Sequence, residues 1–301
     1  MRAIISFLCV VAATTLFAQA GEKYAPGTSF KDCEKCPEMM VLPAGEFTYG
    51  RERARDFTDD EYGQIERQLY AMTTKKVSIA AFAIGRYEVT YGEYMHCVAA
   101  GGCNENPMED FGADPRLPAV GITWPMAQNY VRWLNEKTGR VYRLPSSSEW
   151  EYAAKAGTHT SYWWGDKMED GRVLCRGCFQ NPQGMPGYNT TTGRFERPYH
   201  VGFFPSNPFG LHDMLGGVME WVQDCVVTSV QNIPSGGSPY EPNKECVLFR
   251  DGRYAQFNGM RMIRGGDFDA QLSFMVVSDI KINATDFRKN FLGFRVVAEI
   301  Q

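Results

Sequence analysis

The chain has 301 residues, and its 31 Lys and Arg residues nearly balance its 35 Asp and Glu residues, for a formal net charge of −4. The charges are spread evenly, without the basic stripe that a phosphate backbone requires, so the composition argues against nucleic-acid binding. Glycine and proline are frequent and scattered, at 30 and 16 residues. This pattern favours a compact fold with many turns and few long regular elements.

The first twenty residues have the organisation of a secretory signal peptide. Arg2 provides the positive end, residues 4–17 form an apolar run, and residues 18–20 are an Ala-Gln-Ala cleavage site. The run is short for a membrane span, and no second run of about 18 apolar residues follows, so we expect no membrane insertion. The sequence predicts cleavage near Ala20, an N-terminal extension over residues 21–37, and a periplasmic or secreted mature protein.

Eight cysteines follow the signal peptide. An even number behind an export signal indicates disulfides, because that compartment oxidises thiols. Local spacing favours two pairs, Cys97 with Cys103 and Cys225 with Cys246. The other four cysteines form two C-x-x-C pairs, namely Cys33 with Cys36 and Cys175 with Cys178. For these the sequence leaves three alternatives: each pair closes on itself, the two pairs cross-link, or all four sulfurs bind one zinc ion. No βαβ pattern surrounds either pair, which argues against thioredoxin-like redox chemistry.

Three helices are predicted from their first residues. Thr90 and Ser146 each precede a glutamate by three positions, which is the spacing of a capping box. Thr123 stands before a segment with proline near its start and apolar residues at helical spacing. The helices are predicted to end near glycines, namely Gly101, Gly139 and Gly157.

Strand candidates are few and short. They are residues 39–42, 77–84, 261–263 and 294–297. Residues 158–260 show little periodicity, and a stretch of that length fits a compact domain only where cross-links or bound ions hold the backbone.

Six sequence blocks resemble successive blocks of formylglycine-generating enzymes, the sulfatase-modifying factor family, and stand in the same order. They are MMVLPAGEFTYG, VSIAAFAIGRYEVTYGEY, LPAVGITWPMAQNYVRWLNEKTGRVYRLPSSSEWEYAAKAG, FPSNPFGLHDMLGGVMEWVQDC, RMIRGGDF and LGFRVV. The resemblance implies one domain over residues 38–301. It also implies an α+β fold of the C-type-lectin-related type, with little regular secondary structure.

The chain departs from this family at the copper site. In members that act as oxidases, two cysteines after an Arg-Gly-Gly segment hold copper, since soft thiolates suit Cu(I). Here that segment begins at Arg264, the cysteine positions match Ala270 and Met275, and no cysteine follows Cys246. We therefore expect neither bound copper nor the family's oxidation of a substrate cysteine.

The resemblance implies a structural calcium ion. Asp213 and Glu220 match the side-chain ligands of the family's second calcium site, and Gly216 and Val218 match its backbone carbonyl ligands. Crowded oxygen donors suit calcium, which accepts irregular geometry. The alternative is that Asp213 is a solvated acid and Glu220 a salt-bridge partner.

Two further points concern calcium. Within that block the family's usual Gly-Asn-Val-Trp is Gly-Gly-Val-Met here, over residues 216–219. The family's other calcium site is not expected, because the position of its acidic ligand falls near Gly193.

Asp267 and Asp269 match the floor of the family's substrate groove. In an extended segment both would face one side, and two close carboxylates raise the pKa of one, which yields a candidate catalytic acid near neutral pH. Alternatively, they cap a turn or pair with Arg264 or Arg288. The groove residues expected from the resemblance are Arg264, Asp267, Asp269 and Arg295.

Three functions stay open from the sequence. The first is a periplasmic enzyme that matures a peptide natural product, as exported relatives implicated in siderophore chromophore maturation imply. The second is a non-catalytic lectin-like module, and the third is a true formylglycine generator, against which the missing thiols argue. The expected partner is a peptide, a peptide-derived natural product or a glycan.

Overall fold

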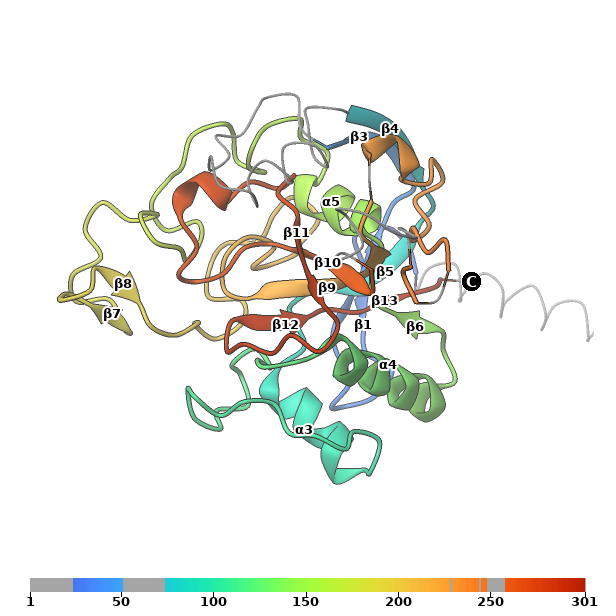
Figure 1. Ribbon diagram of the computed structural model, residues 1–301, viewed down its shortest axis with the longest axis horizontal. Helices are drawn as coiled ribbons and strands as arrows, with labels where there is room; N and C mark the ends of the chain where they lie inside the picture. Colours follow the sequence, from blue (N-terminus) through green and yellow to red (C-terminus); the bar gives the residue numbers. More distant parts are fainter. Residues whose placement is uncertain (1–23, 51–73, 228, 244, 248–257, 301) are drawn as a thin grey trace, which may run out of the picture.

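The computed structural model describes residues 24–50, 74–227, 229–243, 245–247 and 258–300 (Figure 1). The predicted signal peptide lies outside the described residues. Among those residues, the longest helix has 15 residues and the longest strand has seven. The expectation of an α+β fold with little regular secondary structure is confirmed.

Most strands belong to two sheets. The first is antiparallel and is ordered β1-β2-β5-β13-β6, with bounds Ser29–Phe30, Met39–Leu42, Phe82–Gly85, Val297–Ala298 and Tyr142–Arg143. The second is ordered β11-β10-β9-β12, with bounds Lys281–Ala284, Met260–Arg264, Met219–Cys225 and Leu292–Phe294. Here β12 runs parallel to β9, whereas β10 is antiparallel to both of its neighbours. Two hairpins complete the strands, β3–β4 (Gly45–Gly50 and Thr74–Ile79) and β7–β8 (Tyr188–Asn189 and Arg194–Phe195).

The three predicted helices are present, as α3 (Tyr91–Ala99), α4 (Trp124–Thr138) and α5 (Ser147–Lys155). Thr90 and Ser146 form complete capping boxes, and the Thr123 hydroxyl accepts a hydrogen bond from the backbone of Met126. Because these caps satisfy backbone donors that a helix start leaves free, they position the helices firmly. Helix α5 stops one residue earlier than expected, at Ala156, which adopts a left-handed conformation with φ of 47°. Two short 3-10 helices are η1 (Val230–Asn232) and η3 (Leu272–Phe274).

The predicted strands are found with different bounds. The segment over residues 77–84 contains parts of two strands, β4 and β5, and the segment over residues 294–297 crosses from β12 in one sheet to β13 in the other. The central strand β9 was not predicted. Five of its seven residues are buried, so it lacks the alternation that reveals a half-exposed strand. Residues 29–30 of the predicted N-terminal extension form β1 and pair with β2.

The helices cover opposite sides of the sheets (Figure 1). Helix α5 contacts β3, β4, β9 and β10, whereas α4 contacts β6 and α3. Trp150 on α5 and Trp221 on β9 are fully buried, each in a separate core cluster. A third, smaller cluster is largely aromatic and consists of Leu174, Phe195, Tyr199, Phe204 and Phe268.

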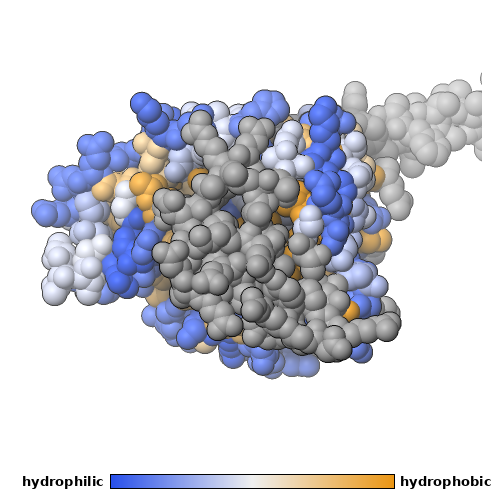
Figure 2. Space-filling view, turned by 45° about the horizontal axis from the view of Figure 1, so that its top comes forward, coloured by the Kyte–Doolittle hydropathy of each residue, from blue (hydrophilic) through white to orange (hydrophobic). Residues whose placement is uncertain are grey.

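All eight cysteines of the described residues form disulfides, namely Cys33–Cys36, Cys97–Cys103, Cys175–Cys178 and Cys225–Cys246. The two local pairings are confirmed, and each C-x-x-C pair closes on itself rather than crossing or binding zinc. On the face in Figure 2, hydrophilic side chains surround small hydrophobic patches. No helix in the described part of the chain combines the length and the apolarity that crossing a membrane requires.

Candidate functional site

Arg264, at the end of β10, is buried rather than exposed to a groove. Only 1% of its surface is accessible, and its guanidinium donates to Glu151 Oε2 at 2.6 Å and to the Val277 carbonyl at 3.1 Å. The guanidinium also lies over the ring of Trp150, 5.0 Å from its centroid. Arg264 therefore connects β10 to α5. We expected it to line a substrate groove at the surface, and in the structure it is buried instead.

Arg295 is also buried, in a bidentate ion pair with Glu220. Its Nε and one terminal nitrogen lie 2.7 Å from the two oxygens of that carboxylate. Trp150 Nε1 donates to the same carboxylate at 2.8 Å, and Arg295 further donates to the Gly85 carbonyl at 3.1 Å. Neither partner of the ion pair is exposed. Glu220 therefore takes part in a salt bridge, which was one of the two roles considered from the sequence.

Three residues of the expected calcium site, Asp213, Gly216 and Val218, lie on the loop that leads into β9, and the fourth, Glu220, is the second residue of that strand. Asp213 has a left-handed backbone, with φ of 54°, and its carboxylate accepts a hydrogen bond from the Gly202 amide at 2.5 Å. Burial is the main cause that raises the pKa of Asp213 to about 6. The carbonyls of Gly216 and Val218 are enclosed and accept no hydrogen bond within the described part of the chain.

This donor set fits a calcium ion in part. Two enclosed, unpaired carbonyls and a carboxylate are the oxygen ligands that calcium prefers. Both oxygens of Glu220, however, already accept hydrogen bonds from Arg295 or Trp150. Among the described residues, no three His, Cys, Asp or Glu side chains converge closely enough to hold an ion by themselves. An ion would therefore depend on the carbonyls, and the calcium site stays a prediction.

Glu88 lies between β5 and α3, and its carboxyl group is close enough to those of Asp213 and Glu220 to interact with them electrostatically. Sequence reasoning did not single out this residue. It is 2% exposed, and its Oε2 has no hydrogen-bond partner within the described residues. Burial first, and then the neighbouring Asp213 carboxylate, raise its pKa well above the ordinary value, against the opposing effect of Arg295. The only sequence signal was its place two positions before the helix cap Thr90.

Asp267 and Asp269 lie together directly after β10. Asp267 is 6% exposed, and its Oδ1 accepts a hydrogen bond from the Asp269 amide at 2.8 Å, so it caps a turn. Burial is the largest cause that raises the pKa of Asp267 to about 6. Asp269 is more exposed and lies 3.4 Å from Arg194 and 3.7 Å from Arg176. The alternative that the aspartates pair with Arg264 or Arg288 was wrong. Arg264 pairs with Glu151, and Arg288 donates to the carbonyls of Gly121 and Asn106.

The two positions that match the family's copper cysteines lie close together. A Cβ atom built on Gly266 would lie 2.6 Å from the sulfur of Met275 and 3.7 Å from the Cβ of Ala270. The Cys175–Cys178 loop lines the same segment, because the Arg176 amide donates to the Ala270 carbonyl at 3.0 Å. Both cysteines of that loop are buried and joined to each other. Within the described residues, the site therefore has no free thiol.

Aromatic side chains adjoin the two aspartates. Phe268 stands between them in sequence and packs edge-on against Phe111, with ring centroids 5.7 Å apart. It belongs to the aromatic cluster that includes Tyr199, whose ring lies 4.6 Å from that of Phe203. Phe203 is 57% exposed, which is high for a large apolar side chain. The site thus combines an enclosed carboxylate, an arginine-paired carboxylate and a nearby aromatic cluster.

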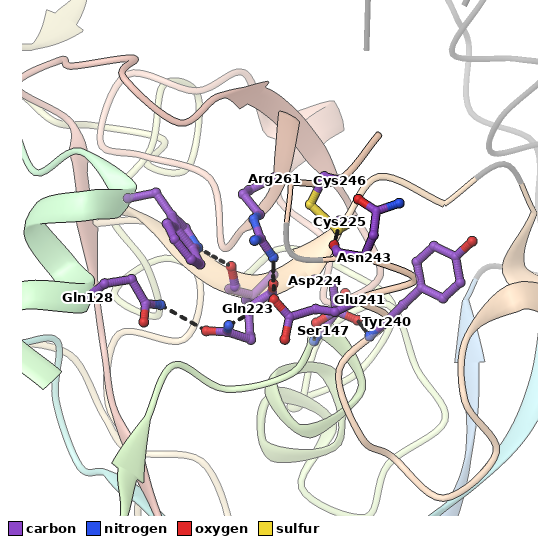
Figure 3. A network of polar contacts seen from close by, with 12 residues as sticks. Gln128, Ser147, Gln223, Asp224, Cys225, Tyr240, Glu241, Asn243, Cys246 and Arg261 are labelled. Carbon is purple, nitrogen blue, oxygen red and sulfur yellow. Dashed lines mark hydrogen bonds and ion pairs between the residues drawn. A yellow bond between two sulfur atoms is a disulfide. The ribbon is translucent and has the colours of Figure 1, made fainter. Parts of the chain in front are cut away.

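A second hollow, of about 330 Å³, lies between α4 and the segment closed by Cys225–Cys246. Figure 3 shows its polar network, in which Gln128 pairs with Gln223, and Glu241 contacts both Gln223 and Arg261. These polar groups already form hydrogen bonds with one another. The hollow therefore has fewer free polar groups for binding a ligand than the site at Asp267 and Asp269 has.

The fold and these residues define a domain of the formylglycine-generating-enzyme type. The chain matches the family described as "Sulfatase-modifying factor enzyme 1-like domain" over residues 25–300 and belongs to that family.

Two comparisons cover different shares of the chain. The structure titled "Structure of PvdO from Pseudomonas aeruginosa" is 31% identical, with a TM-score of 0.70, and the match covers 91% of this chain and 99% of that one. The formylglycine-generating enzyme of Mycobacterium tuberculosis (strain ATCC 25618 / H37Rv) is 39% identical over 139 residues, which are 40% of this chain and 39% of that protein.

A third relative is named "Inactive C-alpha-formylglycine-generating enzyme 2", from Bos taurus. It is 36% identical over 107 residues, which are 35% of this chain and 32% of that protein. The chain thus matches less than half the length of either curated relative.

Proposed function

We propose that this protein is an exported member of the family that binds and matures a peptide-like substrate at the Asp267–Asp269 site, without copper. The observation that carries the proposal is the juxtaposition around Gly266. The positions of the family's copper cysteines hold Ala270 and Met275 there, whereas Asp267 and Asp269 stay available as carboxylates. The export signal in the sequence supports a periplasmic or extracellular role.

The two aspartates differ in environment, and so they suit different tasks. A carboxyl group with a pKa of about 6, as burial gives Asp267, exchanges its proton near neutral pH and can act as a general acid or base. Asp269 stays closer to solvent and is held by Arg176 and Arg194. These arginines can bind a carboxylate or a main-chain carbonyl of a peptide, since guanidinium groups donate in a planar fork.

Calcium enters the proposal as a structural ion at Asp213, Gly216, Val218 and Glu220. The enclosed carbonyls of Gly216 and Val218 support it, because buried carbonyls without a partner are uncommon. An ion at this loop would fix the start of β9. Strand β9 pairs with β10, and Asp267 stands three residues after the end of β10. The role of the ion would therefore be to position the site, not to take part in the reaction.

The experiment is a deletion of the gene in its host, followed by metabolite profiling. A substrate-like precursor should accumulate, and it should persist when the deletion is complemented with Asp267→Asn but disappear with the wild-type chain. As a matched control, Asp224→Asn changes another buried aspartate away from the site and should restore the product. An unchanged metabolome in the deletion strain would refute a maturation enzyme.

The second candidate is a non-catalytic binding module. It is favoured by the similarity to a relative that is named inactive. In that case Asp267→Asn would complement as well as the wild type does, whereas loss of Arg176 and Arg194 would abolish complementation.

A further inference from the structure

Two arginines from different loops converge on the carboxylate of Asp269. Arg176 Nε lies 3.7 Å from Asp269 Oδ1, and Arg194 Nη1 lies 3.4 Å from the other oxygen, Oδ2. The three side chains are partly exposed, at 31% for Arg176, 49% for Arg194 and 32% for Asp269. Guanidinium groups that meet at a partly open surface can bind an anion, because each presents several donors in a planar fork.

The contact between Arg176 and Asp269 is an ion pair without a hydrogen bond. Arg176 Nε and Asp269 Oδ1 are both enclosed, and neither has a hydrogen-bond partner within the described residues. Most enclosed polar atoms in proteins are paired. Because this charged donor is not, Arg176 has unused capacity to bind a further acceptor.

The Cys175–Cys178 disulfide closes the short loop that carries Arg176. Both cysteines are buried, and Gly177 between them adopts φ of 84°, a conformation that glycine tolerates. The Arg176 amide donates to the Ala270 carbonyl at 3.0 Å. The loop is therefore fastened to the residue that follows Asp269, and the backbone as well as the charge places Arg176 at that carboxylate.

The β7–β8 hairpin places Arg194. Arg194 pairs with Asn189 across this hairpin, and the next residue, Phe195, is 3% exposed. The ring of Phe195 lies 5.6 Å from that of Phe179, which directly follows Cys178. This aromatic contact holds the hairpin against the disulfide loop, so the two arginines stay close to each other.

The charges at this contact leave one positive charge in excess. Arg176 and Arg194 bring two, and Asp269 neutralises one, so the excess matches a singly charged carboxylate better than a doubly charged sulfate. The enclosed Asp267 lies within electrostatic reach of the same groups. Burial first, and then the Asp269 carboxylate, raise its pKa, whereas Arg176 lowers it. An anion held by the arginines would therefore lie near the proposed catalytic acid.

We propose that Arg176 and Arg194 bind a carboxylate of the substrate, and that the Cys175–Cys178 disulfide holds Arg176 in place for this task. The inference rests on the proposed function and narrows its substrate to a peptide-like molecule with a carboxylate near the group that reacts. That carboxylate belongs to a chain end or to an acidic side chain, which share the same chemistry. Binding there brings the adjoining part of the substrate to Asp267.

The test titrates the purified wild-type chain with short peptides and follows the arginine Nε–H signals by nuclear magnetic resonance. The probes are N-acetyl-triglycine, its C-terminal amide, and N-acetyl-glycyl-aspartyl-glycine amide, so a carboxylate is the only charge that any of them carries. The signals of Arg176 and Arg194 should shift with an acid and not with the uncharged amide. A shift with the triglycine acid alone assigns a chain end, and a shift with the aspartyl peptide assigns an acidic side chain.

Substitutions measure the contribution of each arginine. Arg176→Gln and Arg194→Gln should each lower the affinity for the acid about tenfold, because hydrogen bonds between charged groups are among the stronger ones. Both variants should unfold close to the wild-type temperature, since exposed ion pairs contribute little to stability. The matched control is Arg172→Gln, because Arg172 pairs with Glu169 at 2.9 Å instead, and it should keep the wild-type affinity.

The role of the disulfide is tested by replacing Cys175 and Cys178 with alanine. This double variant should also lose about tenfold in affinity, because Arg176 then stands on an open loop. Replacing Cys97 and Cys103 with alanine is the control, since that disulfide joins α3 to the loop after it. Wild-type affinity in a folded Cys175, Cys178 variant would overturn the role of the disulfide.

Other outcomes would overturn the carboxylate subsite itself. They are a wild type that binds neither acid, one that binds the acid and the amide equally, one that binds sulfate more tightly than the acid, and arginine variants with unchanged affinity. The proposed function fails separately, when deletion of the gene leaves the metabolome unchanged. A subsite lost with a precursor that still accumulates removes only the inference, and a subsite kept with an unchanged metabolome removes only the maturation reaction.

Discussion

Arg295 and Glu220 face each other in the core through two hydrogen bonds of 2.7 Å, and neither side chain is exposed to solvent. Glu220 belongs to β9, and Arg295 stands between the last strand of the second sheet and the last strand of the first. The pair therefore lies where the chain passes from one sheet to the other. Arg295 also donates to the Gly85 carbonyl on β5, so its guanidinium group connects a strand of each sheet.

Glu220→Gln should destabilise the protein by about 3–5 kcal/mol, because it leaves the Arg295 guanidinium buried without its charge partner. The measurement is urea unfolding in the presence of EGTA, so that no bound calcium contributes. Glu46→Gln is the control, since Glu46 pairs with Lys76 at the surface and exposed pairs contribute little. Equal unfolding midpoints for the two variants would contradict the role of the buried pair.

A disulfide should contribute more stability when it closes a longer loop, although the contribution grows only with the logarithm of the loop length. Replacing Cys225 and Cys246 by serine opens a loop with a sequence separation of 21, which corresponds to about 3 kcal/mol of stability in the chain-entropy estimate. Replacing Cys33 and Cys36 opens a separation of only three and should cost about half as much. Calorimetric unfolding of the two double variants checks the order. A larger loss for the shorter loop would show that native contacts, not loop closure, dominate.

Stability should depend on pH through Asp267. Its pKa in the folded protein is raised to about 6 from an ordinary 3.8, so the folded state holds this proton more tightly than the unfolded state does. Its contribution is therefore fully present below pH 3.8 and is lost as the pH rises through 6. The loss is at most about 3 kcal/mol, since one pKa unit corresponds to about 1.4 kcal/mol.

Asp267→Asn removes this proton and keeps an oxygen that can accept the hydrogen bond from Asp269. The stability of the wild type relative to the variant should fall between pH 4 and 6.5, as measured by urea unfolding at each pH. Parallel curves for the two proteins would mean that Asp267 does not titrate in this range.

The wild-type chain should not convert a Cys-x-Pro-x-Arg peptide to an aldehyde in the presence of copper. Soft thiolates suit Cu(I), and the positions that match the family's two cysteines hold Ala270 and Met275, of which only Met275 carries a sulfur, in a weaker thioether ligand. The double variant Ala270→Cys, Met275→Cys should gain Cu(I) binding, because both positions flank Gly266. Mass spectrometry of the peptide and a Cu(I) competition assay check the two expectations. Aldehyde formed by the wild type would refute the copper-free site.

Local features were readable from the sequence, and distant pairings were not. The helix starts at Thr90, Thr123 and Ser146 depend on side chains a few positions away, so sequence spacing was enough to predict them. The pairing of Asp269 with Arg194 spans 75 positions and depends on how loops without regular structure meet. Such loops carry no periodic pattern, and so their contacts could not be predicted.

The resemblance to a family located the site but not its electrostatics. The resemblance led us to expect Arg264 and Arg295 in the substrate groove. In the structure both side chains lie in the core, where each guanidinium group pairs with a buried carboxylate. An arginine in a sequence motif looks the same whether it binds a ligand or holds two strands together. Only the placement of Glu151 and Glu220 distinguishes these roles.

The covalent link between Cys225 and Cys246 has a consequence for limited proteolysis. It joins the end of β9 to the far side of a segment rich in proline and glycine. A protease that cuts once inside this segment would leave two fragments still bonded to each other. The nicked protein would migrate as a single band on a non-reducing gel and separate into two only after a thiol is added.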